Sequence, residues 1–332
     1  MYAFQSFLTK HVAKKGEPFT HTSMGGCVGA YNITDDTDVF SKLYCEVYKA
    51  GRFGLHMTEK HLPDRSPILI DLDLRRQTVP DAVAFRLYDA EMYTRFIGVY
   101  VRQLARYVDV NGARFYVMEK PHGGVVKNRA KDGVHIVCPD VVLAPETQLA
   151  VRAAVLPEVG ELFAKYTDNT AAECFDEAVI ARNNWIMYGS SKQDAPPYQV
   201  TRAFRVGPDG GLVEASLEAD DPCDYVELFS IRSKRELTPL VATAPVKSEV
   251  VRKHVVKGEV VRVARNQQHA DVEEIGRLVM ILSRSARTTT TRGCVSGSAC
   301  TARARSWWTS GSSSAGGAAS SRKASARSCG AR

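Results

Sequence analysis

Two aspartates in one short apolar segment are the first residues whose spacing could support catalysis. Residues 67–74 read PILIDLDL, which predicts a short strand bounded by proline. Because side chains alternate along a strand, Asp71 and Asp73 share one face and the neighbouring Ile and Leu side chains share the other. Two carboxylates on one face could hold a pair of Mg²⁺ or Mn²⁺ ions, which suits in-line phosphoryl transfer. The alternative is a polar edge-strand face paired with Arg75 and Arg76.

A histidine lies on a second predicted strand, residues 133–138, which read GVHIVC. His135 shares its face with Gly133 and points away from the apolar residues on either side of it. An imidazole there could contact a triphosphate, with Lys131 supplying positive charge. A core histidine with satisfied hydrogen bonds explains the same pattern.

Residues 175–192 contain a third acid and a lysine that ends a turn of small residues. Asp176 comes first, and Gly189, Ser190 and Ser191 precede Lys192. Such a turn can present amides, hydroxyls and an ammonium group to phosphates. It is not a Walker A loop, since GxxxxGK[ST] occurs nowhere in the chain. An ordinary surface turn is the alternative.

The elements that must position these residues alternate between strands and helices. Apolar residues at spacings of three and four predict helices over about 81–107 and 145–166, and the apolar stripe of the first is expected to be core. Further strands are expected at 114–119 and 198–206, and residues 1–60 look like an irregular N-terminal lobe. Without regular βαβ spacing, this order favours an α+β fold with a mainly antiparallel sheet.

Composition separates the C-terminal part from the rest. The 332 residues carry a formal charge of +7, but residues 287–332 have eight basic side chains and no acidic one. The preceding residues therefore have 36 basic and 37 acidic side chains. Ser, Ala, Gly and Thr dominate the tail, so we expect it to be disordered. An Arg/Ser-rich nucleic-acid-binding tail is one interpretation, and translation in a shifted reading frame is another.

The shifted frame gives a protein-like sequence. Trp307-Trp308-Thr309 would become Val-Asp, and codon degeneracy over 285–301 permits a string that continues the helical pattern of residues 271–283. We therefore expect a domain at 1–235, a basic linker at 236–270, the start of a truncated helical module at 271–286 and a low-complexity tail at 287–332. Resequencing the gene across codons 283–292 tests this hypothesis.

Composition also bounds the class of protein. No apolar run approaches the roughly 18 residues of a membrane span, and no signal-peptide pattern precedes the domain. Eight cysteines without a CxxC pair fit a reducing compartment. We therefore expect an intracellular protein without a membrane partner.

Taken in order, the three segments resemble the archaeo-eukaryotic primase superfamily, which includes the PrimPol enzymes. The motifs are DLD, then KxGxH, then an Asp followed by GSSK, with MTEK at 57–60, PPY at 196–198 and FSIR at 229–232 in support. The resemblance covers roughly residues 20–235, and is closest to the primase domain of primase–helicases from large nucleocytoplasmic DNA viruses.

The resemblance implies a two-lobed α+β primase fold with a sheet like that of the RNA-recognition motif. It also implies a primase/polymerase that makes primers on single-stranded DNA from nucleoside triphosphates. Two Mg²⁺ or Mn²⁺ ions would be held by Asp71, Asp73 and Asp176. The residues implied for nucleotide binding are Lys131, His135, Ser190, Ser191, Lys192 and Arg182.

This chain departs from the family pattern at two places. The family's serine two residues before the motif histidine is Gly133 here, and the arginine-rich stretch before the Ser-Ser-Lys keeps only Arg182. Relatives carry a helicase further along, which is absent here, so the product looks truncated or damaged.

Three rival functions remain open at this point. They are an inactive primase-like adaptor that binds nucleic acid or a replisome, a DxD glycosyltransferase and a rolling-circle initiator. A glycosyltransferase leaves His135 and Lys192 without a role, and the HxH pair of an initiator is missing.

Overall fold

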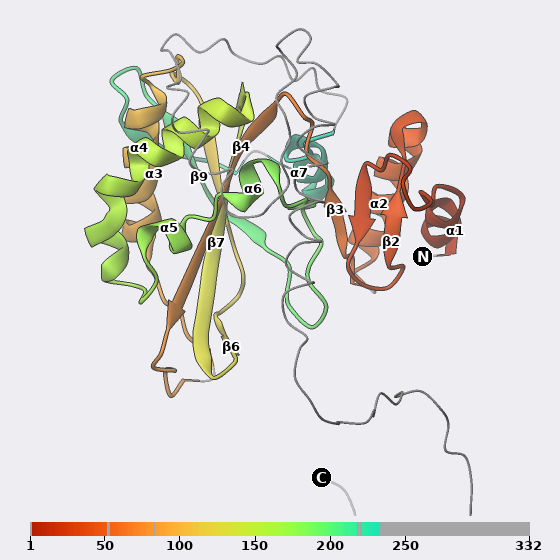
Figure 1. The fold of residues 1–332 in the computed structure, drawn as a ribbon, viewed down its shortest axis with the longest axis horizontal. Helices are drawn as coiled ribbons and strands as arrows, with labels where there is room; N and C mark the ends of the chain where they lie inside the picture. The colour runs from red at the N-terminus through yellow and green to blue at the C-terminus, as the bar shows by residue number, and fades with distance from the viewer. Residues whose placement is uncertain (1, 52–53, 83, 218, 220, 233–332) are drawn as a thin grey trace, which may run out of the picture. The chain divides into compact units, whose positions relative to one another are not determined.

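The computed structural model describes residues 2–51, 54–82, 84–217, 219 and 221–232, and those residues carry two β-sheets (Figure 1). The linker, helical module and tail predicted for residues 236–332 lie outside the described residues. Within them, every pair of named strands is antiparallel. The predicted α+β class with a mainly antiparallel sheet is confirmed. The comparisons with a two-lobed primase and with the RNA-recognition motif stay predictions.

The larger sheet has six strands, in the order β10-β9-β5-β7-β4, with β6 paired to β7. Its strands are β4 (Ser66–Arg76), β5 (Arg114–Glu119), β6 (Gly124–Val126), β7 (Arg129–Leu143), β9 (Gln199–Val206) and β10 (Leu212–Ala215). All four strands expected in this part of the chain are present. Two are longer than expected, because β4 and β7 pair along nearly their whole length, from Ser66 opposite Leu143 to Arg76 opposite Ala130.

The smaller sheet has four strands, in the order β2-β1-β3-β8. They are β1 (His21–Ser23), β2 (Gly29–Tyr31), β3 (Met57–Glu59) and β8 (Trp185–Ile186). Three elements accompany them: α1 (Tyr2–Lys10), the 3-10 helix η1 (Thr34–Asp36) and α2 (Thr37–Ala50). The expectation of an irregular N-terminal lobe was therefore wrong. Strands of two or three residues show no periodicity in the sequence, and β3 pairs with β1 on one side and with the distant β8 on the other.

The remaining helices are α3 (Ala90–Leu104), α4 (Pro145–Ala164), α5 (Ala171–Cys174), α6 (Ala178–Ala181) and α7 (Pro222–Leu228). The helix expected from residue 81 begins only at Ala90, because the Asp89 side chain accepts from Met92 N at 2.9 Å and caps it. The residues before it bind β7 instead: Asp132 accepts from Leu87 N at 3.0 Å and from the Arg86 guanidinium. No helix in the described part of the chain is long and apolar enough to cross a membrane.

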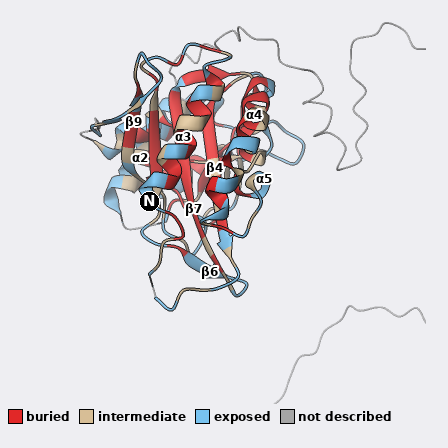
Figure 2. Cartoon of the chain, turned by 90° about the vertical axis from the view of Figure 1, so that its left-hand side faces the viewer, coloured by how far each residue is buried: buried red, intermediate tan, exposed pale blue. Residues whose placement is uncertain are grey.

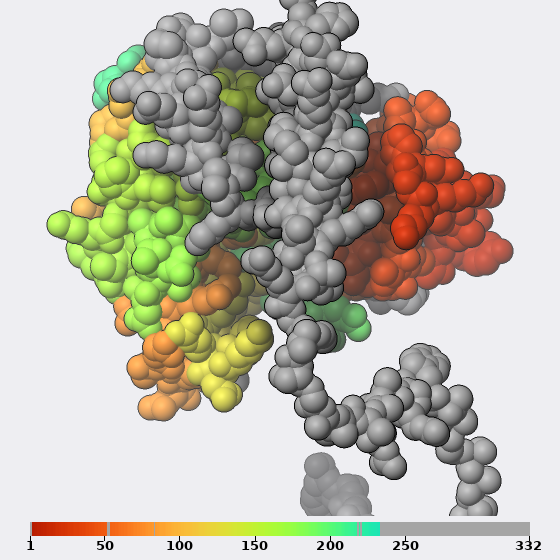
Figure 3. Space-filling view, viewed as in Figure 1, coloured from red at the N-terminus to blue at the C-terminus, as the bar shows by residue number. Residues whose placement is uncertain are grey.

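The core has two parts, one on each face of the larger sheet. The strands β4 and β7 between them are mostly buried (Figure 2). On β4, Ile68, Ile70, Leu72 and Leu74 pack with α3 and α4, and the predicted core stripe of α3 lies there. Leu69 joins the second cluster, with residues of the smaller sheet and α7. Alternation therefore turns Asp71 and Asp73 toward the smaller sheet. In Figure 3 the N-terminal segment, red to red-orange, lies on the right, and residues 145–174, yellow-green, on the left.

Candidate active site

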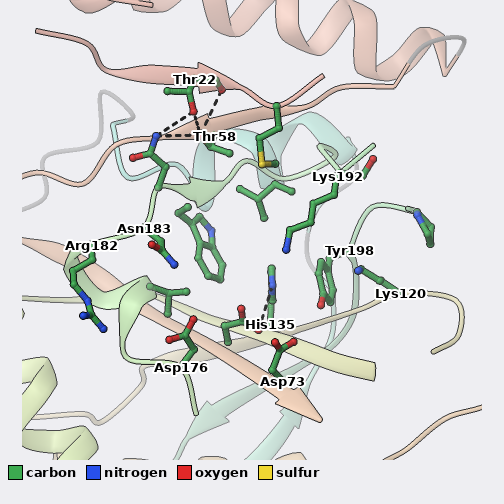
Figure 4. A pocket seen from close by; sticks show the side chains of 18 of the residues that line it. Thr22, Thr58, Asp73, Lys120, His135, Asp176, Arg182, Asn183, Lys192 and Tyr198 are labelled. Carbon is green, nitrogen blue, oxygen red and sulfur yellow. Dashed lines mark hydrogen bonds and ion pairs between the residues drawn. The ribbon is translucent and has the colours of Figure 1, made fainter. Parts of the chain in front are cut away.

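A pocket of about 510 Å³ is lined by residues of both sheets and of the segment around α6 (Figure 4). Of the nine residues proposed from the sequence, eight line it: Asp71, Asp73, Asp176, Lys131, His135, Arg182, Ser191 and Lys192. The ninth, Ser190, does not. The pocket thus gathers acidic and basic groups from three separate stretches of the chain.

Asp71 lies directly opposite His135 in the β4–β7 pair. Its Oδ1 atom is buried and has no hydrogen-bond partner, and His135 Nε2 is 3.6 Å away. Burial, and then the negative charges of Asp73 and Asp176, raise the pKa of Asp71 to about 7. A buried carboxylate oxygen without a partner is costly, which is typical of a site that binds a cation.

Asp73 has partners where Asp71 lacks them. Its Oδ2 accepts from Lys131 Nζ at 2.9 Å and from the Arg75 guanidinium at 3.3 Å. Lys131 lies opposite Arg75 on the neighbouring strand, so it reaches Asp73 diagonally across the ladder. The arginine pairing considered from the sequence is therefore real for Arg75, while Arg76 instead donates to backbone oxygens of Lys165 and Tyr166.

Asp176 is brought beside these two acids by backbone contacts. Its N–H donates to Asp71 O at 3.0 Å, and Phe175 forms an isolated bridge with Leu72. The Asp176 Oδ1 atom accepts from Ala178 N at 2.9 Å at the start of α6. The loop between α5 and α6 therefore acts as a short additional partner of β4.

The three carboxylates have the donor chemistry of a divalent-cation site. Hard oxygen ligands suit Mg²⁺ and Mn²⁺, and the unpartnered Asp71 Oδ1 supplies free lone pairs. Among the described residues, no three His, Cys, Asp or Glu side chains are grouped closely enough to enclose an ion. The three carboxylates are the type of ligand that such a cation prefers, and the Asp73 carboxylate is paired with Lys131.

His135 is held between two aromatic rings. Its ring stacks on Tyr198 with 3.7 Å between centroids, and Trp185 lies at 4.7 Å on a tilted plane. Burial, and then the positive charges of Lys120, Lys192 and Lys131, lower the pKa of His135 well below its usual value. The imidazole is therefore neutral at pH 7 and can donate one hydrogen bond. It is buried, yet it lines the pocket, so it differs from an ordinary core histidine.

Three lysines surround the pocket, and sequence reasoning missed one of them. Lys120 follows directly after β5 and places its ammonium group 4.7 Å from the Tyr198 ring centroid. Burial, and then the charges of Lys192 and Lys131, lower the pKa of Lys120. A lysine just beyond the predicted strand 114–119 is the only sequence signal for it. Together the three lysines form an anion-binding wall.

The Ser190 hydroxyl turns away from the pocket into the smaller sheet. It accepts from Met57 N at 2.9 Å and pairs with the Tyr44 hydroxyl at 2.8 Å. Ser191 lines the pocket, and its backbone is fixed by Leu55 O at 2.8 Å and by His56 Nδ1 at 2.7 Å.

Arg182 lies at the edge of the pocket with its side chain 63% exposed, and it donates to Glu177 Oε1 at 2.8 Å.

The opposite wall of the pocket is neutral and was not foreseen from the sequence. The hydroxyls of Thr22 and Thr58 are 2.6 Å apart, and Asn184 Nδ2 donates to them at 3.2 and 3.3 Å. Met24, Val179 and Ile186 add apolar surface. This wall comes from very short strands, and although Thr58 lies in the MTEK segment, no role was predicted for it.

Gly133 sits where the family resemblance leads one to expect serine. A Cβ atom at this position would lie 2.6 Å from Leu72 O on the paired strand and 3.6 Å from Asp73 Oδ1. The close approach of β4 and β7 at Asp73 therefore requires glycine here.

The chain is similar in sequence to known proteins. A protein of Acanthamoeba polyphaga mimivirus named "Putative helicase L207/L206" is 32% identical over 212 residues, which is 61% of this chain and 22% of that protein. The chain thus spans about a fifth of this relative. Residues 20–204, more than half of the chain, match the family described as the C962R protein N-terminal AEP domain. The chain therefore belongs to this family of archaeo-eukaryotic primase domains.

Proposed function

We propose that this chain is a template-directed primase/polymerase that joins nucleotides from NTPs or dNTPs on single-stranded DNA, in viral-type DNA replication. The observation that carries the proposal is the pocket, in which Asp71, Asp73 and Asp176 face Lys120, Lys131 and Lys192. Family membership supports a primase-like role. Acids that suit cations beside bases that suit phosphates are what a nucleoside triphosphate and its counterions require.

Each group has a distinct role in this proposal. Asp71, Asp73 and Asp176 would hold two Mg²⁺ or Mn²⁺ ions, which when bound supply charge neutralisation for the triphosphate and activation of the attacking 3′-hydroxyl. Lys131 and Lys192 bind the phosphates. His135, neutral and fixed between two rings, donates a hydrogen bond to a phosphate oxygen without adding charge.

The neutral wall leaves room for the rest of the nucleotide. Trp185 and Ile186 offer apolar surface, while Asn184 and the two threonine hydroxyls offer hydrogen bonds. Base and sugar need this mixture, since a base has a flat apolar face and polar edges. We therefore assign the phosphates to the wall of lysines and the nucleoside to the neutral wall.

The test is primer synthesis on single-stranded DNA by the full chain. Asp71→Asn/Asp73→Asn should lower the rate at least ~10³-fold, because both carboxylates are lost with little change in volume. The matched control is Asp140→Asn, which changes an acid at the far end of β7 that pairs with Arg114. Wild-type rates in the double variant would refute the site.

A second candidate is an inactive primase-like adaptor that binds nucleic acid or a replisome. The pairing of Asp73 with Lys131 and Arg75 favours it, since a carboxylate so neutralised is a weaker cation ligand. Calorimetry discriminates between the two, because only the enzyme requires nucleotide binding that depends on Mn²⁺.

A further inference from the structure

A buried arginine lies directly behind the loop that carries Asp176. Arg152 is on α4 and is only 4% exposed. Its guanidinium donates to Phe175 O at 2.9 Å from Nε and at 2.6 Å from Nη2, and to Ala172 O at 2.8 Å. It also contacts Glu177 Oε2 at 3.4 Å and lies 5.3 Å from the centre of the Phe175 ring.

These contacts bracket Asp176 on both sides. Phe175 and Glu177 are its immediate neighbours, and both bind the same guanidinium. On the other side of the loop, Asp176 N donates to Asp71 O. The loop is therefore clamped between α4 and β4, with only the Asp176 carboxylate directed into the pocket (Figure 4).

The local contacts of this loop are few: a capping box of Thr170 and Glu173 starts α5, and Asp176 Oδ1 accepts from Ala178 N. The helices α5 and α6 have four residues each, too few to be stable alone. The last carbonyls of such a helix need partners, and Arg152 supplies donors for those of Ala172 and Phe175. A buried guanidinium is costly for a fold, so an apolar residue would serve simple packing better.

We propose that Arg152 is a positioning residue, which sets the place of the Asp176 carboxylate relative to Asp71 for binding a divalent cation. The inference rests on the proposed function and adds to it a residue outside the pocket. Arg152 touches no reacting group. Its effect passes through the backbone on both sides of Asp176, and its positive charge offsets those of Asp176 and Glu177.

Gln148 provides a matched control on the same helix. It lies one turn before Arg152, is 1% exposed, and donates to Ser66 O at 2.9 Å and to Pro67 O and Leu143 O at 3.3 Å. It fixes α4 to the start of β4, away from the acids. Arg152→Met and Gln148→Met each remove a buried fork of hydrogen bonds, and both should lower the Tm.

The experiment measures Mn²⁺ binding to the full chain by electron paramagnetic resonance, with the Tm of each variant recorded. Arg152→Met should weaken Mn²⁺ binding about 10–100-fold, the usual effect of losing a residue that orients a ligand. Gln148→Met should leave it within about threefold, and Arg152→Lys should recover part of the loss.

Two results would overturn the inference. Equal Mn²⁺ affinities in Arg152→Met and Gln148→Met, with normal binding by wild type, would refute the role of Arg152 and leave the proposed function unaffected. Absence of Mn²⁺ binding by wild type would refute the proposed function and the inference with it. If Arg152→Met does not fold, the Mn²⁺ affinity of Arg152→Lys is compared with that of Gln148→Met instead, because lysine keeps the positive charge and loses the forked hydrogen bonds of the guanidinium.

Discussion

The two walls of the pocket are built in different ways. The charged wall, made of Asp71, Asp73, Lys131 and His135 with Asp176 and Lys192 beside them, rests mainly on β4 and β7, which have 11 and 15 residues. The neutral wall, made of Thr22, Thr58 and Asn184, rests on strands of two or three residues and on hydrogen bonds between side chains. A long ladder fixes each group to a register, as catalysis requires. Short strands fix less, which under the proposed function suits a surface that would meet variable bases.

The largest difference between the walls should appear in nucleotide use. Lys192→Gln should lower kcat/KM for the nucleotide about 100-fold, mainly through KM, because it removes a charge directed at phosphate. Thr58→Val, on the neutral wall, should lower it less than about fivefold. Steady-state kinetics of primer synthesis measures both, and equal losses would contradict the division into two walls.

The charged wall should also be sensitive to pH. Because the pKa of Asp71 is raised to about 7, its carboxylate is protonated at lower pH and must lose that proton to bind a cation. Mn²⁺ affinity should fall up to about tenfold for each pH unit below 7. Asp71→Asn should remove this dependence, and calorimetry from pH 5.5 to 8 measures it. A flat profile in wild type would count against Asp71 as a ligand.

Substitutions in the two walls should change the Tm in opposite directions. The pKa of Asp71 is higher in the folded than in the unfolded chain, so stability falls as pH rises from about 4 to 7 and stays low above that. Without metal at pH 8, Asp71→Asn should therefore raise the Tm by about 2–6 °C, and the gain should vanish near pH 4.

Thr58→Val should instead lower the Tm by about 2–4 °C, because Thr22 and Asn184 lose a hydrogen-bond partner. Thermal melts of both variants give the sign directly. A lower Tm for Asp71→Asn at pH 8 would show that Asp71 stabilises the fold.

The smallest effect is expected at Tyr198, whose ring lies against His135 on the charged wall. Tyr198→Phe keeps the ring that stacks on His135 and should change kcat/KM less than about threefold. Tyr198→Leu loses the stack and should cost about tenfold. Similar losses in the two variants would show that the hydroxyl is what matters.

The charged wall could be predicted from the sequence because it lies on long alternating strands. Asp71 and Asp73 were placed on one face by the strand period alone, and His135 on the matching face of its strand. The register that sets Asp71 opposite His135 could not be predicted, because it depends on pairing between distant strands. Asp176 was noted as a third acid, but its place beside Asp71 and Asp73 came only from the family resemblance, since no local pattern brings it to β4.

The neutral wall and the support of the site could not be predicted in this way. Thr22 and Thr58 lie on strands too short to have a period, and the resemblance implied no role for Thr58 or Asn184. Arg152 lies in the helix predicted at 145–166, where nothing in the sequence distinguishes it from the other polar residues. The family resemblance implied that Ser190 binds nucleotide, but its hydroxyl pairs with that of Tyr44.

Gly133 limits redesign of this chain by substitution toward the family pattern. Restoring the family serine there would drive a side chain into Leu72 O, in the ladder that holds Asp73. A side chain at this position would require β4 and β7 to lie further apart than they do. Gly133 departs from the family pattern, yet in this molecule Leu72 and Asp73 of the paired strand are packed against the space that a side chain would fill.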